Sequence, residues 1–196
     1  MIDQINLLSP KSVINTGDIM NNPYMDVEHA YAMMSGISSP WVAIKGNHDA
    51  DVVWLKKDYA FTLDGLRLIF LHGVEYEVDY AVTTEESLAF VESELQDLNG
   101  LTPIMLSHYS VMDQWYGAYV EANQTAILAL LNTYNVPLYL CGHTHADFGV
   151  EIYQQTTHIS GGTPVQYYRG GNGGFMICDD YLFDLTQFGM LESSNG

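Results

Sequence analysis

The chain is built from short apolar runs separated by glycine and polar residues. Short apolar and β-branched runs between turn residues are typical of buried strands. Such runs lie at 11–15, 41–44, 103–106 and 136–141. Residues 61–63 and 66–71 are joined by Asp64-Gly65, a dipeptide that favours a two-residue hairpin turn. The pattern therefore predicts a core of buried strands that includes one hairpin.

Three segments between these runs carry apolar side chains at helical spacing. They are residues 26–35, 83–98 and 124–131. Thr83 and Glu86 have the spacing of a capping box at the start of the second helix. After Gly142 the pattern changes to strand signals, at 148–153, 156–160, 174–178 and 181–185. Helix–strand alternation followed by a strand-rich end predicts one α/β domain over residues 1–196, with two stacked mixed β-sheets and helices outside.

Composition narrows the classes of partner. The hydrophobic fraction of 47% indicates a folded globular protein. No apolar run approaches the ~18 residues of a membrane span, and no signal peptide opens the chain, so the sequence predicts a soluble protein and leaves its compartment open. The net charge is −18 with only six Lys and Arg, which disfavours binding to duplex nucleic acid. Cys141 and Cys178 lie in strand-like runs and are predicted to be buried free thiols.

Polar clusters follow four of the predicted strands. They are Thr16-Gly17-Asp18, Gly46-Asn47-His48-Asp49, Ser107-His108 and Gly142-His143-Thr144-His145. In open α/β sheets, ligands bind outside the carboxyl ends of the strands. Carboxylate, amide oxygen and imidazole together suit a hard-to-borderline divalent cation, and the absence of cysteine from the clusters disfavours a structural zinc site. The sequence therefore predicts a divalent metal site where these four clusters meet.

The order and identity of these clusters resemble the calcineurin-like metallophosphoesterase family, from about Val13 to Leu185. The resemblance implies a four-layer sandwich fold, hydrolysis of phosphoesters, and two divalent ions such as Mn, Fe or Zn. It implies that Asp18 bridges the two metals and that His145 binds the first metal. It also implies a second-metal shell and two catalytic positions: Asn47, His108 and His143 as ligands, His48 and Asp49 as catalytic residues. Among these, His48 would assist the leaving oxygen, and Asp49 would either take part or only shape the turn.

The chain departs from the family pattern in two places. The family begins with a strand that ends in Asp-x-His, and no such motif precedes Asp18 here, so the family fold is predicted to be truncated at its N-terminus. The first metal would then keep only Asp18 and His145, and at most one ion would bind tightly. An acidic residue that often orients the catalytic histidine in the family is replaced by Asn21, which cannot balance an imidazolium charge.

Several functions remain open on the sequence alone. A hydrolase of a small phosphodiester is favoured over a phosphomonoesterase, and the non-enzyme alternative is a degenerate metal-binding protein that binds a ligand or partner. The aromatic residues after His108 (Tyr109, Trp115, Tyr116 and Tyr119) either stack on a substrate or, as we favour, pack as a lid. Lys56, Lys57 and Arg169 are candidates to meet a substrate phosphate. His72 ends a strand and is favoured as a structural histidine. The sequence leaves the substrate and oligomeric state undecided.

Overall fold

The protein is described by a computed structural model covering residues 2–20, 27–49, 52–76, 80–112, 118–144 and 149–161. Its largest sheet has six strands in the order β3-β4-β7-β8-β10-β9. The strands are β3 (Tyr59–Leu63), β4 (Leu66–Leu71), β7 (Thr102–Ser107), β8 (Leu138–Cys141), β9 (Gly149–Tyr153) and β10 (Thr156–Ser160). β4, β7, β8 and β10 are parallel, and the outer strands β3 and β9 run antiparallel to their neighbours.

Two smaller sheets accompany it within the described part of the chain. β1 (Val13–Asn15) and β2 (Trp41–Ala43) pair in parallel. β5 (Val74–Tyr76) and β6 (Tyr80–Val82) form a short antiparallel pair beyond the end of β4. The helices in these ranges are α1 (Ile2–Leu8), α2 (Val27–Met34), α3 (Glu85–Gln96) and α4 (Glu121–Thr133).

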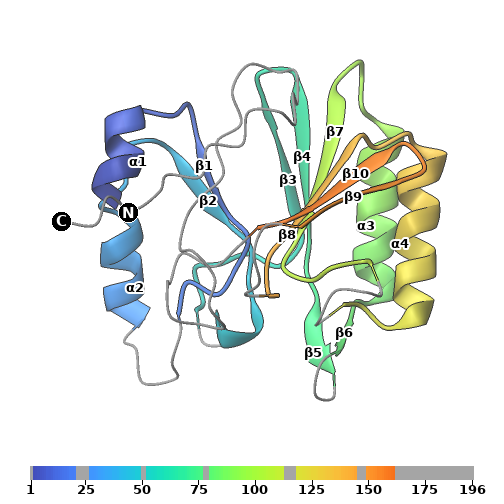
Figure 1. Ribbon diagram of the computed structural model, residues 1–196, viewed down its shortest axis with the longest axis horizontal. Helices are drawn as coiled ribbons and strands as arrows, with labels where there is room; N and C mark the ends of the chain where they lie inside the picture. Colours follow the sequence, from blue (N-terminus) through green and yellow to red (C-terminus); the bar gives the residue numbers. More distant parts are fainter. Residues whose placement is uncertain are drawn as a thin grey trace.

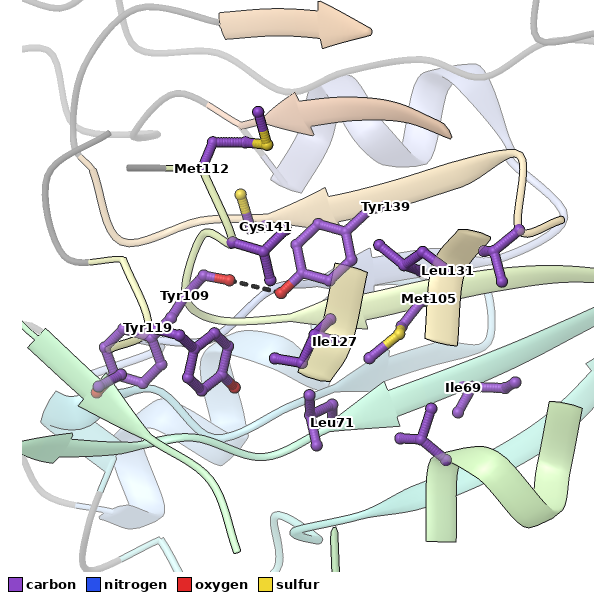
Figure 2. Close-up of a cluster of buried hydrophobic side chains, with 14 of the residues drawn as sticks. Ile69, Leu71, Met105, Tyr109, Met112, Tyr119, Ile127, Leu131, Tyr139 and Cys141 are labelled. Atoms are coloured by element: carbon purple, nitrogen blue, oxygen red, sulfur yellow. Dashed lines mark hydrogen bonds between the residues drawn. The ribbon is translucent and has the colours of Figure 1, made fainter. Parts of the chain in front are cut away.

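The β1–β2 sheet and the large sheet each carry apolar side chains on both faces. They pack on each other and on the helices outside them, which gives four layers (Figure 1). α1 and α2 cover the outer face of the β1–β2 sheet through Ile5, Ala30 and Met34. Ile44 lies with Phe70 and Leu106 in the core that the β1–β2 unit shares with the large sheet. The opposite face of the large sheet packs on α3 and α4. Figure 2 shows this second core, in which Tyr139 donates a hydrogen bond to the carbonyl oxygen of Tyr109 over 2.7 Å.

Most predicted elements are confirmed with small shifts in their ends. The Asp64-Gly65 hairpin forms, and both residues have positive φ (46° and 85°), as a type I′ turn requires. The capping box predicted from Thr83 and Glu86 is wrong. Thr84 is the N-cap of α3 and accepts a hydrogen bond from the Ser87 amide, whereas the Thr83 hydroxyl donates to the carbonyl oxygen of His72.

Other predictions were incomplete or lie outside the described residues. α1 and the β5–β6 pair were not predicted, since neither is long enough to show a clear period. The strands predicted at 174–178 and 181–185 lie outside the described residues, as does Cys178. Cys141 is a buried free thiol as predicted, and burial raises its pKa to about 12. Among the described helices, none is long and apolar enough to cross a membrane.

Candidate metal centre

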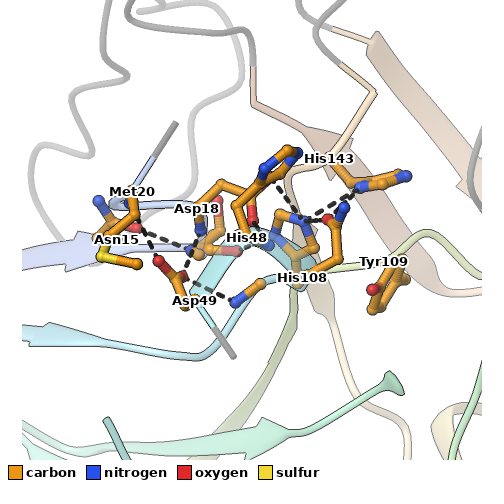
Figure 3. A network of polar contacts seen from close by, with 12 residues as sticks. Asn15, Asp18, Met20, His48, Asp49, His108, Tyr109 and His143 are labelled. Carbon is orange, nitrogen blue, oxygen red and sulfur yellow. Dashed lines mark hydrogen bonds and ion pairs between the residues drawn. The ribbon is translucent and has the colours of Figure 1, made fainter. Parts of the chain in front are cut away.

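The candidate site lies where the carboxyl ends of four strands from two sheets meet. β1 and β2 lead to Asp18 and Asn47, and β7 and β8 lead to His108 and His143. The two sheets are held together below the site by a shared apolar core. The polar residues that follow the strands therefore face one another across the junction of the sheets (Figure 3).

Three ligand-type atoms form a tight triangle at this junction. The Nε2 atom of His108 lies 3.1 Å from the Oδ1 atom of Asn47 and 3.1 Å from the Nδ1 atom of His143. The same His143 nitrogen lies 3.1 Å from the Asn47 oxygen. A fourth atom, the Oδ2 of Asp18, lies 3.4 Å from the His108 nitrogen. Ligand atoms of Asp18, His108 and His143 all lie within 4.8 Å of one another.

The tautomer of His108 is set by its second nitrogen. The Nδ1 atom lies 2.7 Å from the backbone carbonyl oxygen of Thr16. Because a carbonyl oxygen only accepts, Nδ1 carries the proton, and in the neutral ring the lone pair is on Nε2. That lone pair points toward the Asn47 oxygen and the carboxylate of Asp18. A histidine that donates one N–H to a backbone carbonyl and offers the other nitrogen is the usual arrangement of a metal ligand.

The carboxylate of Asp18 is held in its ionised form without a full set of hydrogen bonds. Its Oδ1 accepts from the amide of His48 over 3.0 Å, whereas the buried Oδ2 has no hydrogen-bond partner in the described part of the chain. Burial raises the pKa of Asp18, but the hydrogen bond and charge that His108 supplies in its protonated form, with the contacts of His48, outweigh burial and leave the pKa below its usual value. A buried, charged oxygen without a donor is costly, and a cation would satisfy it.

Two of these residues adopt an unusual backbone conformation. Asp18 has φ of 56° and His143 has φ of 67°, in the left-handed region that residues with a side chain seldom enter. Such conformations cost free energy and persist where the surroundings determine them, as at binding sites. The fold thus accepts strain at two of the four ligand-type residues.

Asp49 holds the Asp18 turn and the Asn47 turn together. Its side chain is fully buried, and its Oδ2 accepts from the amides of Asp18 (2.7 Å) and Gly46 (3.0 Å). Its Oδ1 accepts from the amide of Met20 over 3.1 Å. With these three amide partners, Asp49 makes the contacts of a residue that shapes the turn. Its predicted catalytic part stays a prediction.

Close packing around the site requires glycine at two positions. A Cβ atom on Gly46 would lie 2.1 Å from the Oδ1 of Asp18, and one on Gly17 would lie 2.5 Å from the Nδ1 of His108. Gly17 also has φ of 107°, which favours glycine. The glycines of the two motifs therefore let the loops approach the ligand-type side chains.

Tyr109 and Tyr119, two of the aromatic residues after His108, form a wall and not an open platform. The ring of Tyr109 is 1% exposed, and its centroid lies 4.9 Å from the rings of both His108 and His143. Tyr119 is fully buried and shares a 2.8 Å hydrogen bond with the hydroxyl of Ser107. The favoured packing role is confirmed for these two residues, and Trp115 and Tyr116 lie outside the described residues. Burial, with the nearby charges of Glu75 and Asp18, raises the pKa of Tyr109, so its phenol stays protonated.

The remaining candidates are placed as follows. His48 is exposed at the start of the turn that follows Gly46. His145, Asn21 and Arg169 lie outside the described residues. His72 is half-buried beside the site, and its Nδ1 is buried without a hydrogen-bond partner in the described ranges. Burial lowers the pKa of His72, and the charges of Lys57 and Lys45 lower it further against the opposing charge of Asp58.

Sequence reasoning found the ligand-type residues but missed their supports. Thr16, whose carbonyl oxygen orients His108, and Tyr109, whose ring packs on two histidines, were not assigned these roles. The position of Tyr109 directly after His108 was the available signal. No pattern in the sequence marks the carbonyl of Thr16, because every residue has one.

The donor set fits a divalent cation. It combines one carboxylate oxygen, one amide oxygen and two imidazole nitrogens, a mixture that suits Mn, Fe or Zn. The uncompensated Oδ2 of Asp18 and the lone pair of His108 would both gain a partner. The described geometry thus supports a site for one ion.

Comparison with known proteins agrees with this site. A model of the calcineurin-like phosphoesterase family matches residues 1–147. None of the curated proteins matches the chain.

The fold is shown by its likeness to the solved structure of GAP50. GAP50, the anchor in the inner membrane complex of Plasmodium, has a TM-score of 0.57 at 13% identity, with 83% of this chain and 64% of that chain covered. The chain thus spans less than two thirds of GAP50. Wild-type Vps29 from Entamoeba histolytica, complexed with Zn²⁺, has a TM-score of 0.49 at 12% identity, with 92% of this chain and 76% of that chain covered.

Proposed function

We propose that this chain, which belongs to the calcineurin-like phosphoesterase family, is a metal-dependent hydrolase that acts on a small phosphoester. A phosphodiester is the favoured substrate and a phosphomonoester the second. The family match supports phosphoester chemistry in general, and the preference for a diester is our inference from the sequence. The low content of Lys and Arg supports a small substrate over duplex nucleic acid.

One observation carries the proposal: ligand-type atoms of Asp18, Asn47, His108 and His143 converge at one point. The Nδ1 proton of His108 is donated to Thr16, so the Nε2 atom faces the oxygen of Asn47 and the carboxylate of Asp18. The Nε2 atom of His108 and the Oδ2 atom of Asp18 are both acceptors in this tautomer, and a cation between them would satisfy both. The fold supports this arrangement with a buried carboxylate, Asp49, and with strained backbone at Asp18 and His143.

The residues around the centre have distinct proposed tasks. Asp18, Asn47, His108 and His143 would hold one ion, and Asp18 with His145 would hold a second ion more weakly. A bound divalent ion supplies Lewis-acid activation of water and of the phosphoryl group. Thr16 and Tyr109 orient the two histidine rings, and Asp49 fixes the loops that carry Asp18 and Asn47.

His48 is proposed as the proton donor to the leaving oxygen. Its amide is fixed by the carboxylate of Asp18, and its side chain is exposed, so the imidazole can meet a substrate. General acid assistance of this kind contributes roughly 10²–10⁴-fold to turnover. A proton delivered to the departing oxygen removes the need for a good leaving group.

The test compares turnover of a diester and a monoester with one leaving group. Bis(p-nitrophenyl) phosphate and p-nitrophenyl phosphate would be assayed with Mn²⁺, Fe²⁺ or Zn²⁺, using the wild type and Asn47→Ala. The proposal expects metal-dependent release of p-nitrophenol, faster from the diester, and its loss in Asn47→Ala. Faster release from the monoester would reverse the preferred class.

Metal binding without turnover of either ester would favour the non-enzyme alternative. That alternative is motivated by the residues before Asp18, among which the sequence shows no Asp-x-His motif. If the protein neither binds metal nor turns over either ester, the proposal is refuted.

A further inference from the structure

The basic residues of this acidic chain are unevenly distributed around the centre. Lys11 pairs with Asp64 at 3.0 Å, and Arg67 pairs with Glu94. Arg67 lies at the start of β4, and the site lies beyond its end, about 15 Å away at the usual rise of a strand. The other described cations are Lys45, Lys56 and Lys57. Three of the six basic residues thus fall between positions 45 and 57.

Strand pairing brings Lys57 to the side of the metal centre. β3 runs antiparallel to β4, with Tyr59 opposite Phe70, so the residues just before Tyr59 lie beside the end of β4. Asp58 confirms this position, because its Oδ1 accepts from the amide of His72 over 2.8 Å. The residue that precedes Asp58 is Lys57, whose charge acts on the imidazole of His72.

The same pairing argument places His72 beside a metal ligand. β4 and β7 are parallel, with Leu71 opposite Ser107. The next residue of each strand is a histidine, His72 and His108, so the two leave neighbouring strands side by side. His72 is half-buried, and its Nδ1 has no hydrogen-bond partner among the described residues.

Lys45 reaches this group from the other sheet. The hydroxyl of Tyr59 donates to the carbonyl oxygen of Ala43 over 2.9 Å, which ties the segment before β3 to the end of β2. Lys45 follows Ala43 by two residues and precedes Asn47 by two, and its charge also acts on His72. The Lys56 ammonium lies 5.7 Å from the Tyr59 ring centroid, at the margin of the same group.

The nearby carboxylate of Asp58 offsets part of the positive charge and is hydrogen-bonded to neutral groups. Asp58 uses its second oxygen to accept from the hydroxyl of Ser87 over 2.7 Å, in addition to its bond with the His72 amide. No carboxylate lies within ion-pair distance of Lys57 in the described part of the chain. A local group of cations in a chain of net charge −18 creates a place where an anion is favoured.

We propose that Lys45, Lys57 and His72 form an anion subsite beside the metal centre, which holds a second phosphate or carboxylate group of the substrate. The inference rests on the proposed function for its substrate, a phosphoester. It narrows the substrate to a phosphoester in which the substituent that lies toward β4 carries a second anionic group. Lysine ammonium groups would bind this group as charges, and the imidazole of His72 would donate one hydrogen bond.

The first experiment needs no catalysis. Binding of inorganic pyrophosphate to the metal-free protein would be measured by calorimetry for wild type, Lys45→Gln, Lys57→Gln and Lys11→Gln. Lys45→Gln and Lys57→Gln should each weaken binding about 5- to 20-fold, whereas Lys11→Gln, which removes the same charge elsewhere, should change it less than about twofold. Lys57 is exposed, so its variant tests the subsite even if Lys45→Gln is unstable. Equal weakening in all three variants, or no binding by the wild type, would overturn the subsite.

The second experiment separates the subsite from the function. Two p-nitrophenyl phosphodiesters whose other arm is ethyl or carboxyethyl would be compared with metal present. The wild type should show a KM about 5- to 20-fold lower for the carboxyethyl ester, and this ratio should approach one in Lys57→Gln. Turnover of both esters with equal KM would overturn the subsite and leave the function standing. No turnover of either ester, with pyrophosphate binding as expected, would refute the function and leave the subsite standing.

Discussion

The Nδ1 atom of His108 lies 2.7 Å from the carbonyl oxygen of Thr16, and this contact joins the two sheets at the candidate site. Thr16 follows β1 in the small sheet, and His108 follows β7 in the large one. The contact fixes both the tautomer and the direction of the ring, so that Nε2 points toward Asn47 and Asp18. The stacking of the two sheets is therefore also what orients the ligand-type nitrogen.

Replacement of Asp49 should loosen both turns of the site. An asparagine side chain would present one acceptor oxygen and one amide group to three backbone donors, so Asp49→Asn should lower the free energy of unfolding by about 2–4 kcal/mol. Urea denaturation would measure the loss. Asp64→Asn is the matched control, since Asp64 is an exposed partner of Lys11 and its loss should cost less than about 1 kcal/mol. Equal losses in both variants would contradict the role given to Asp49.

Addition of one methyl group at Gly46 should damage metal binding. Its Cβ would lie 2.1 Å from the Oδ1 of Asp18, so Gly46→Ala must displace that carboxylate. We expect Mn²⁺ affinity to fall at least about tenfold, as for other changes that disturb metal ligands from behind. Gly161→Ala, whose Cβ would meet its nearest atom at an ordinary 3.6 Å, should bind Mn²⁺ like the wild type. Calorimetric titration of both variants decides the matter, and unchanged affinity in Gly46→Ala would show that Asp18 is not a ligand.

Loss of the His48 imidazole should depend on the leaving group. If His48 protonates the departing oxygen, His48→Asn should reduce turnover roughly 10²–10⁴-fold for an alkyl leaving group. An activated aryl ester departs without a proton and should lose much less. Steady-state rates on a series of esters with rising leaving-group pKa would measure this. A uniform loss along the series would assign His48 to binding.

The buried His158 should make the protein sensitive to acid. It is fully buried on β10 with neither ring nitrogen hydrogen-bonded within the described ranges, and burial lowers its pKa to about 4. Between the ordinary value of about 6.5 and pH 4 the unfolded chain binds a proton that the folded chain does not, so stability falls as the pH falls. From pH 7 to pH 5 the wild type should lose about 2 kcal/mol more than His158→Leu. Urea midpoints at the two pH values measure this difference, and parallel losses would place the sensitivity elsewhere.

Much of the fold and of the candidate site could be predicted from the sequence. Asp18, Asn47, His108 and His143 could be predicted to converge because each follows an apolar strand, and parallel strands end at the same edge. The Asp64-Gly65 turn was predictable because Asp-Gly is a preferred pair for the two positive-φ positions of a type I′ turn. In these cases the signal lies within a few neighbouring residues.

Other features depend on which strands become neighbours. The partners of Asp49, the carbonyl of Thr16 behind His108 and the wall made by Tyr109 arise only when two sheets stack. The cap of α3 was misplaced by one residue: Glu86 favoured Thr83 in the sequence, but in the structure the Thr83 hydroxyl donates to the carbonyl of His72 and Thr84 is the cap. Local patterns contain no information on such contacts.

The most direct test of the account is the metal content of His108→Ala compared with that of His72→Ala. The two histidines leave neighbouring strands side by side, but only His108 has its lone pair directed at Asn47 and Asp18. After incubation with Mn²⁺ and removal of free ions, elemental analysis of the wild type and of His72→Ala should give about one tightly held ion per chain. His108→Ala should retain little of it, because the three remaining donors bind far more weakly than four. Equal metal content in the two variants, or no metal in the wild type, would contradict the account.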